Sequence, residues 1–404
     1  MNNLSFLFVF FLNPFVATIR ALRTLNEKAI VFGVTLFMGF FGTTTFFYGD
    51  NQRYRDAFFV MHEQVLSWDN FINTFYDGET TFDVAIPLIS YAVSLFTGNE
   101  KILFAIFGLI FGYFFSKNIV LSLQISKYKD SKSKMVLFFV IIFSFIYPFW
   151  AGTNAVRFVI ANTMFFYFLF QYITSEKKVY LLYLFIPTLF HFSFIIPIFI
   201  TYFYLLSNVK KQIKFLFVFF IISLVLVDFA FEPMKNIVST YTPSFLNTKV
   251  NAYTSDFYIE HVDGIKATKS WHSLYYFKVF RFTIGVLIIH LYFYRKKISN
   301  NPQFNAFFPL LLFYFSFANI ISVIQGLDRF LQLAYMFSIV CILIFLSQIR
   351  NDKIFKITLL PLTFWFVVII RTGFDFVTVG TIISNPVLAF YGFLDDFNLR
   401  QFIK

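Results

Sequence analysis

Apolar runs close to twenty residues long recur along the chain and are separated by short polar segments. Six of these runs cover residues 135–151, 156–173, 213–230, 273–294, 304–324 and 329–348. Runs of this length span a bilayer when they form helices. The pattern predicts an all-α polytopic integral membrane protein. We expect a single transmembrane domain over 1–404 with about 10–13 transmembrane helices, broken or re-entrant elements included.

Composition supports this prediction, with 58% hydrophobic residues, 13% charged residues and a mean hydropathy of +0.71. The net charge of +12 comes from short basic loops, so it indicates membrane topology and not a nucleic-acid partner. The positive-inside bias places these loops in the cytoplasm: 20–28, 127–134, 175–178, 208–214, 295–297 and 350–356.

Counting crossings from these loops assigns Arg157 and the QGLDR stretch at 325–329 to the outer face. It also predicts an outer-face loop with an amphipathic helix over 48–81 and a large extracytoplasmic loop over 231–272. Residues 82–124 need one crossing but contain two apolar runs. The first of these runs is therefore interpreted as a half-span that enters from the outer face.

Residues 179–206 are too few for two full-length helices, yet both flanking loops are basic and require an even number of crossings. Pro187 and Pro197 interrupt this segment. The pattern predicts a broken or re-entrant hairpin with His191 near its apex, which must be shielded by protein or line water.

The sequence excludes several kinds of site. Its one cysteine, Cys341, lies inside an apolar run, and the chain has no CxxC, HExxH or phosphate-binding glycine loop. We therefore expect no disulfide, no metal site and no cofactor. The apolar run at 4–19 has no basic segment before it and no convincing cleavage site, and is interpreted as a retained first span or interfacial helix.

Three arginines lie near the outer ends of inward-returning spans, against the charge bias of the other loops. Arg157 and Arg329 begin such spans, and Arg281 lies roughly 12 Å into another. A guanidinium offers paired donors that fit phosphate oxygens, so these residues predict a pyrophosphate site. The alternatives are snorkelling of Arg157 and Arg329 to the interface, and a buried pair between Arg281 and an outer-loop acid.

His191 is the first candidate for a general base, although a buried structural histidine fits the same position. An outer-loop carboxylate or His272 is the alternative base, and His290 is interpreted as structural. Further candidate substrate-binding residues share a predicted place at the outer face: Arg53, Arg55, Lys278, Asp328, His272 and Trp271.

The stretch NAVRFVIANTMFFYFLFQYITSEKKVYLLYLFIPTLFHFSFIIPIFI resembles the central signature of the EpsG-like, Wzy-type polysaccharide polymerases. That signature has an outer-face arginine that opens a span, a basic cytoplasmic turn, and a short hairpin in which His is followed by Ser. The matching residues, in order, are Arg157, Lys177, Lys178, His191 and Ser193. Residues 50–56 and the DRF at 328–330 fall where the family has further charged residues. TTFDVAIPL, at 80–88, departs from the Glu-Pro-Gly-Phe-like family form, so no acidic residue is carried over there.

The resemblance implies a fold similar to multi-span glycosyltransferases and a metal-independent enzyme of the bacterial inner (cytoplasmic) membrane, with its active site toward the periplasm. Such an enzyme polymerises undecaprenyl-pyrophosphate-linked oligosaccharide repeat units into O-antigen or related surface polysaccharide, transferring the growing glycan onto a new repeat unit. Implied partners are these lipid-linked glycans, membrane lipids and a chain-length-regulating co-polymerase. An O-antigen ligase and a lipid-linked oligosaccharide flippase are the alternatives. A flippase predicts two similar halves, and no such repeat is visible.

Overall fold

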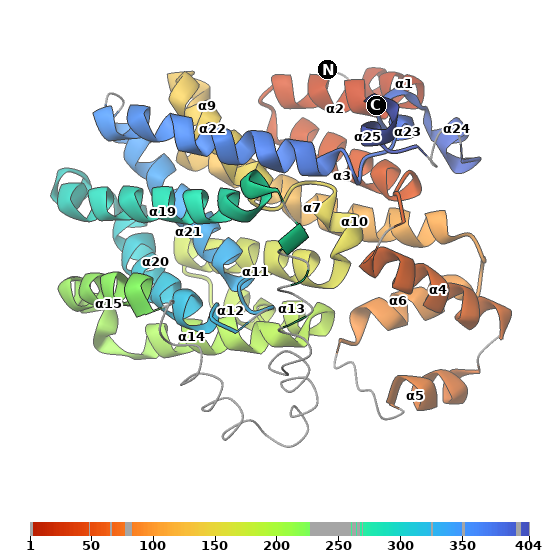
Figure 1. Ribbon diagram of the computed structural model, residues 1–404, viewed down its shortest axis with the longest axis horizontal. Helices are drawn as coiled ribbons and strands as arrows, with labels where there is room; N and C mark the ends of the chain where they lie inside the picture. Colours follow the sequence, from red (N-terminus) through yellow and green to blue (C-terminus); the bar gives the residue numbers. More distant parts are fainter. Residues whose placement is uncertain are drawn as a thin grey trace. The chain divides into compact units, whose positions relative to one another are not determined.

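Helices make up the architecture of the computed structural model (Figure 1). The structure describes residues 3–47, 49–64, 67–76, 83–226, 270–324, 326–349, 352–392 and 397–403, with isolated positions between 260 and 268. Within these ranges there is no strand, and one isolated β-bridge joins Thr378 to Asn398. The prediction of an all-α polytopic fold is confirmed.

The chain forms two compact units that are interleaved in sequence. Unit 1 comprises Met1–Lys132, Phe143–Ile195 and Ile369–Lys404, and unit 2 comprises Ser133–Ile142 and Ile196–Val368. The expectation of a single transmembrane domain stays a prediction.

The helices of unit 1 are α1 (Asn3–Leu12), α2 (Pro14–Arg23), α3 (Glu27–Thr43), α4 (Asp50–Glu63), α5 (Trp68–Tyr76), α6 (Ala85–Ser94), α7 (Glu100–Ile125), α8 (Tyr128–Ser131), α10 (Ala151–Asn154), α11 (Val156–Ser175), α12 (Val179–Tyr183), α13 (Ile186–Phe190), η1 (Phe192–Phe194), α23 (Val379–Ile383), α24 (Pro386–Phe390) and α25 (Leu399–Ile403). Those of unit 2 are η2 (Asn208–Lys211), α15 (Ile213–Leu226), α19 (Trp271–Tyr294), η3 (Arg295–Ile298), α20 (Pro302–Ile321) and α21 (Phe330–Gln348). The helices that run across a unit boundary are α9 (Lys134–Ile146), α14 (Ile195–Leu206) and α22 (Lys353–Gly373).

Seven helices among the described residues are long and apolar enough to cross a membrane. They are Glu100–Ile125, Lys134–Asn154, Val156–Ser175, Trp271–Ile298, Pro302–Ile321, Phe330–Gln348 and Lys353–Gly373. Five of the six predicted spans are among them. The sixth, predicted over 213–230, is represented by the shorter α15, and the residues after Leu226 lie outside the described part of the chain.

Shorter apolar helices occupy residues 179–206 and the start of 82–124, the two regions where the number of crossings did not match the apolar runs. The chain breaks at His191, whose extended backbone (φ −151°, ψ 108°) separates α13 from η1. Pro187 lies in the first turn of α13, where its missing N–H removes no helical hydrogen bond. The predicted interruption is confirmed. In the other region the ten-residue α6 precedes the 26-residue α7, as expected for a half-span followed by one crossing.

In unit 1, α3 and α7 pack with their backbones in direct contact because glycines face the partner helix. A Cβ added to Gly108 would lie 2.0 Å from the carbonyl oxygen of Met38, and one added to Gly42 would lie 2.1 Å from that of Phe104. Small residues permit this close approach between membrane helices, where packing supplies much of the association energy. The pair therefore fixes the segments attached to its ends.

The N- and C-terminal segments of unit 1 lie side by side (Figure 1). The amide of Asn13 donates to the carbonyl of Ile382 at 2.9 Å, and Lys101 Nζ donates to the carbonyl of Ala389 at 2.6 Å. These bonds hold the C-terminal helices against the N-terminal part of the unit.

In unit 2, α20 contacts both α15 and α21, and α19 contacts α21. His290, near the end of α19, places Nε2 at 2.8 Å from Oδ2 of Asp352, which precedes α22. The His290 and Asp352 side chains are only 5% and 12% exposed. This buried pair fits the structural role expected for His290.

Candidate functional site

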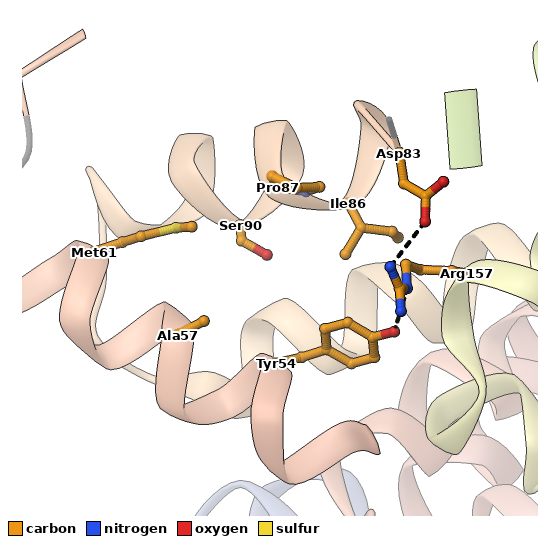
Figure 2. A pocket seen from close by; sticks show the side chains of 8 residues that line it. All are labelled: Tyr54, Ala57, Met61, Asp83, Ile86, Pro87, Ser90 and Arg157. Carbon is orange, nitrogen blue, oxygen red and sulfur yellow. Dashed lines mark hydrogen bonds and ion pairs between the residues drawn. The ribbon is translucent and has the colours of Figure 1, made fainter. Parts of the chain in front are cut away.

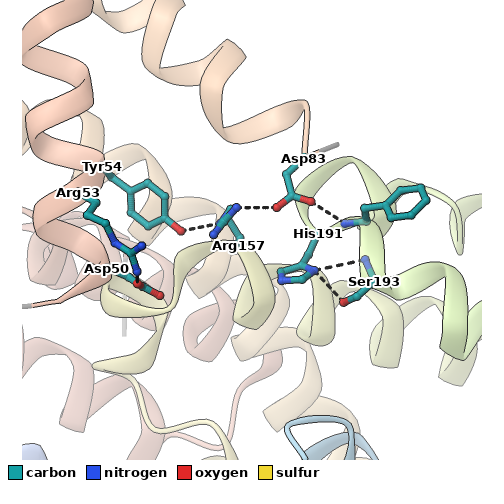
Figure 3. Close-up of polar contacts among 8 residues, drawn as sticks. Asp50, Arg53, Tyr54, Asp83, Arg157, His191 and Ser193 are labelled. Carbon is teal, nitrogen blue, oxygen red and sulfur yellow. Dashed lines mark hydrogen bonds and ion pairs between the residues drawn. The ribbon is translucent and has the colours of Figure 1, made fainter. Parts of the chain in front are cut away.

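Arg157 lies in the first turn of α11, and two side chains from distant segments hold its guanidinium (Figure 3). Nε donates to the hydroxyl of Tyr54 at 2.7 Å, and Nη1 donates to Oδ2 of Asp83 at 2.8 Å. A snorkelling arginine needs water and no buried carboxylate. The geometry therefore favours a cation fixed in place over a snorkelling side chain.

Asp83 is the buried centre of this arrangement, with a side chain only 5% exposed. Its Oδ2 accepts from Arg157, and its Oδ1 accepts from the backbone N–H of Phe192 at 2.7 Å. Phe192 directly follows the break at His191, where a backbone N–H is without a helical partner. One carboxylate thus joins the arginine of α11 to the broken element (Figure 3).

His191 caps η1 with its own ring. Nδ1 accepts from the backbone N–H of Ser193 at 3.3 Å and lies 2.7 Å from Ser193 Oγ. Because a backbone N–H can only donate, Nδ1 is an acceptor, and the neutral ring carries its proton on Nε2. The Ser193 hydroxyl is then the donor to Nδ1, which forms a hydroxyl–imidazole pair.

A cavity of about 100 Å³ opens beside the arginine (Figure 2). Its lining residues come from α4, α6, α11 and the segment before α6: Tyr54, Ala57, Met61, Asp83, Ile86, Pro87, Ser90 and Arg157. The Arg157 side chain is 31% exposed, and among the described residues its Nη2 has no hydrogen-bond partner. The cavity therefore combines a polar end with open donors and an apolar end.

Tyr54 lies on α4, which is not one of the candidate spans. Burial raises the pKa of its hydroxyl above the ordinary value near 10, and the charges of Asp50 and Asp83 act in the same direction against the lowering effect of Arg157. Tyr54 therefore stays protonated at neutral pH and contributes a neutral oxygen to the arginine site.

Unit 2 contains a separate polar cluster around Arg281. Its Nη2 donates to Oδ1 of Asn319 at 2.7 Å, and Nδ2 of Asn319 donates to Oγ of Ser223 at 2.9 Å. Arg281 and Asp328 both lie close enough to Tyr335 to act on its hydroxyl electrostatically. The cluster thus links α15, α19 and α20 and has the DRF segment beside it.

Residues 30–382 match the EpsG family, which is most of the chain. The chain belongs to the EpsG family. EpsG is a Wzy-like polysaccharide polymerase family, so the chain is a multi-pass membrane protein with a polymerase-like role in polysaccharide biosynthesis. No curated protein and no solved structure matches the chain.

The structure brings Arg157 and His191 of the EpsG signature together through Asp83, all within unit 1. Arg281 and Arg329 belong to unit 2, and a single cavity shared by all three arginines and His191 stays a prediction. Arg281 contacts the amide of Asn319, and the alternative of a pair with an outer-loop acid stays a prediction.

The other candidate substrate-binding residues lie at exposed or half-buried positions. In unit 1, Arg53 pairs with Asp50, and Arg55 lies 3.3 Å from Asp56 with its guanidinium over the Phe47 ring.

In unit 2, Trp271 stacks on Phe364 with the ring centroids 5.9 Å apart, and Ser270 Oγ forms a hydrogen bond of 2.9 Å with His272 Nε2. Lys278 lies over the Tyr275 ring, and Asp328 is exposed. Their roles in binding stay predictions. Most of the loop predicted over 231–272, with Asp256, His261 and Asp263, lies outside the described residues, as do parts of 48–81.

Sequence reasoning missed Asp83 and Tyr54. Asp83 lies in TTFDVAIPL, which departs from the Glu-Pro-Gly-Phe-like family form, so the resemblance carries no acidic residue to this position. An isolated carboxylate directly before an apolar half-span was the available signal, since such a charge needs a partner at that depth. Tyr54, inside the charged sequence DNQRYRD, had no comparable signal.

Proposed function

We propose that this protein polymerises lipid-pyrophosphate-linked oligosaccharide repeat units at the outer face of the cytoplasmic membrane. The observation that carries the proposal is the Arg157–Asp83–His191 arrangement. The Arg157 guanidinium lines a cavity and is held by the Asp83 carboxylate. The same carboxylate accepts from the backbone N–H of Phe192, between His191 and Ser193, whose side chains form the hydroxyl–imidazole pair. A cation and a proton acceptor are the two groups that glycosyl transfer from a pyrophosphate requires.

In the proposed reaction a hydroxyl of the incoming repeat unit attacks the anomeric carbon of the growing glycan. The new glycosidic C–O bond forms while the bond from the anomeric carbon to the pyrophosphate oxygen breaks. The polyprenyl pyrophosphate leaves with the electron pair of that bond. Arg157 is the proposed binder of this leaving group, because its Nη2 donors face no described partner and a guanidinium remains charged.

The proton of the attacking hydroxyl needs an acceptor. Because Nδ1 of His191 accepts from Ser193, we assign a relay in which Ser193 Oγ takes the substrate proton and passes its own to Nδ1. Asp83 acts as a positioning residue, because its carboxylate bonds both the Arg157 guanidinium and the backbone N–H of Phe192, which lies between His191 and Ser193.

The test uses the full chain reconstituted in liposomes with purified lipid-linked repeat units. A ladder of polymer supports the polymerase, a single transferred glycan would indicate a ligase, and relocation without new bonds would indicate a flippase. Arg157→Lys and His191→Gln should each lower the polymer yield about 10²–10⁴-fold, since lysine lacks the paired donors and glutamine cannot take a proton.

Arg400→Lys is the matched control, because Arg400 forms an exposed pair with Asp375 away from the lining residues. Ser193→Ala tests the relay separately. Turnover equal to that of the unaltered protein would remove Ser193 from the proton path and leave the arginine assignment intact.

A further inference from the structure

A second cavity, of about 230 Å³, lies in unit 1 at the other end of the α3–α7 pair. It is lined by the start of α3, the end of α7 and the turn that follows: Leu25, Glu27, Ile30, Val120, Leu123, Gln124, Lys127, Tyr128, Lys129 and Asp130. The Arg157 cavity is lined in part by α4, which follows the opposite end of α3. The two cavities have no lining residue in common.

Two basic loops meet at this second cavity. Gln124 Nε2 donates to Glu27 Oε1 at 2.7 Å, which ties the end of α7 to the start of α3. Residues 20–28 and 127–132 together carry six basic and two acidic side chains. The two loops are therefore net positive, and the positive-inside bias assigns them to the cytoplasmic side. The charged side chains that line the cavity itself are Lys127 and Lys129 together with Glu27 and Asp130.

The cavity is amphiphilic. Ile30, Val120 and Leu123 supply an apolar wall, while Lys127 and Lys129 are exposed at the rim. A soluble anion would make no favourable contact with the apolar wall. A phospholipid would, because its acyl chains lie directly below its phosphate.

Backbone strain occurs at two lining positions. Leu25 and Lys127 are non-glycine residues with left-handed backbone, at φ 52° and 49°. Such conformations cost free energy and persist only where the surrounding structure holds them. The two loops are therefore held in the shape that forms the cavity.

We propose that this cavity binds the headgroup phosphate of an anionic glycerophospholipid from the leaflet on the predicted cytoplasmic side. Lys127 and Lys129 bind the phosphate, and the first methylenes of the acyl chains lie on the apolar wall. This lipid would anchor the α3–α7 pair and is distinct from any substrate at Arg157.

The experiment titrates the detergent-purified full chain with dioleoylphosphatidylglycerol or dioleoylphosphatidylcholine and measures bound lipid by native mass spectrometry. The test variant is Lys127→Asn with Lys129→Gln, because asparagine tolerates left-handed backbone and preserves the turn. The control is Lys177→Gln with Lys178→Gln, which removes the same charge from an exposed loop on the same predicted side, outside the lining.

We expect the unaltered chain to prefer phosphatidylglycerol and the test variant to raise its Kd about 25-fold, about fivefold per lysine. The control should bind like the unaltered chain, and Glu27→Gln should bind more tightly. Equal losses in the test and control variants would show general surface attraction and overturn the site. Full displacement of the lipid by millimolar inorganic phosphate would identify a soluble anion as the ligand and overturn the lipid assignment.

Discussion

Replacing Asp83 tests the most connected group of the candidate site. The carboxylate is nearly inaccessible and accepts one bond from the Arg157 guanidinium and one from the Phe192 backbone. Asp83→Ala leaves the cation and the N–H without these acceptors. Removing one partner of a buried pair costs about 3–5 kcal/mol. For a chain of this size we expect the melting temperature to fall by roughly 3–6 °C.

Asp83→Asn separates charge from hydrogen bonding. The amide oxygen can still accept from the Phe192 N–H, whereas the charge that pairs with Arg157 is lost. A hydrogen bond to a charged group contributes about 1.5–3 kcal/mol, so Asp83→Asn should be less destabilised than Asp83→Ala. Polymer yield should fall in both variants, because the guanidinium is no longer oriented.

The assay heats purified protein through a temperature series and follows the monodisperse fraction by size-exclusion chromatography. Asp375→Asn is the matched control, since Asp375 is 38% exposed and pairs with Arg400 at the surface, where an ion pair contributes about 0–1 kcal/mol. The reasoning is refuted if Asp83→Ala melts within 1 °C or so of Asp375→Asn, a difference too small for the loss of a buried pair.

Three further outcomes are expected. Because the pKa of Tyr54 is raised, its contribution to stability is complete below about pH 10 and is lost as pH rises through the folded-state pKa, so Tyr54→Phe should flatten the alkaline decline of the melting temperature. Gly108→Leu should prevent recovery of folded protein, whereas Gly264→Leu should not, because a Cβ added at Gly264 would meet no described atom within 4 Å. Normal yield of Gly108→Leu would contradict the close helix contact. His290→Leu leaves the Asp352 carboxylate without its ring partner and should lower the free energy of unfolding by about 1–3 kcal/mol. Cys341, the one cysteine of the chain, is buried in the same unit, so a thiol dye should label it at a lower temperature in this variant.

Hydropathy predicted the long helices well for a physical reason. In α11, α20 and α21 the apolar run matches the helix to within three residues at each end, because a membrane span needs about 20 apolar residues and the flanking loops are polar. The break at His191 was also predictable, since Pro187 and Pro197 cannot both lie inside one regular helix. Proline disrupts a helix within one turn of its own position, so its effect can be predicted from the neighbouring sequence alone.

The partners of the candidate site were not predictable in the same way. Asp83 contacts Arg157, which is 74 positions further along the chain, and Phe192, which is 109 positions further. The periodicity of the sequence gives no sign of such long-range contacts. The sequence predicted Arg157 as a cation at the outer face but did not indicate that a carboxylate pairs with it. The contact between Arg281 and the amide of Asn319 was likewise not predictable, because an uncharged amide gives no charge pattern in the sequence.

The long sequence separation of the Asp83 contacts has a consequence for biogenesis. At a synthesis rate of about 5–20 residues per second, the Arg157 partner leaves the ribosome about 4–15 s after Asp83, and the Phe192 partner about 5–20 s after it. During that interval α6 is only ten residues long and has an uncompensated carboxylate directly before it, so the helix is too short and the adjacent charge too costly for stable insertion. The half-span must therefore wait at the membrane surface or beside the insertion machinery until α11 and the segment after His191 have been made. Assembly of the arginine site then becomes the last step in the maturation of unit 1's first half, and a chain truncated before residue 192 should be recognised as incomplete by the quality-control proteases of the membrane.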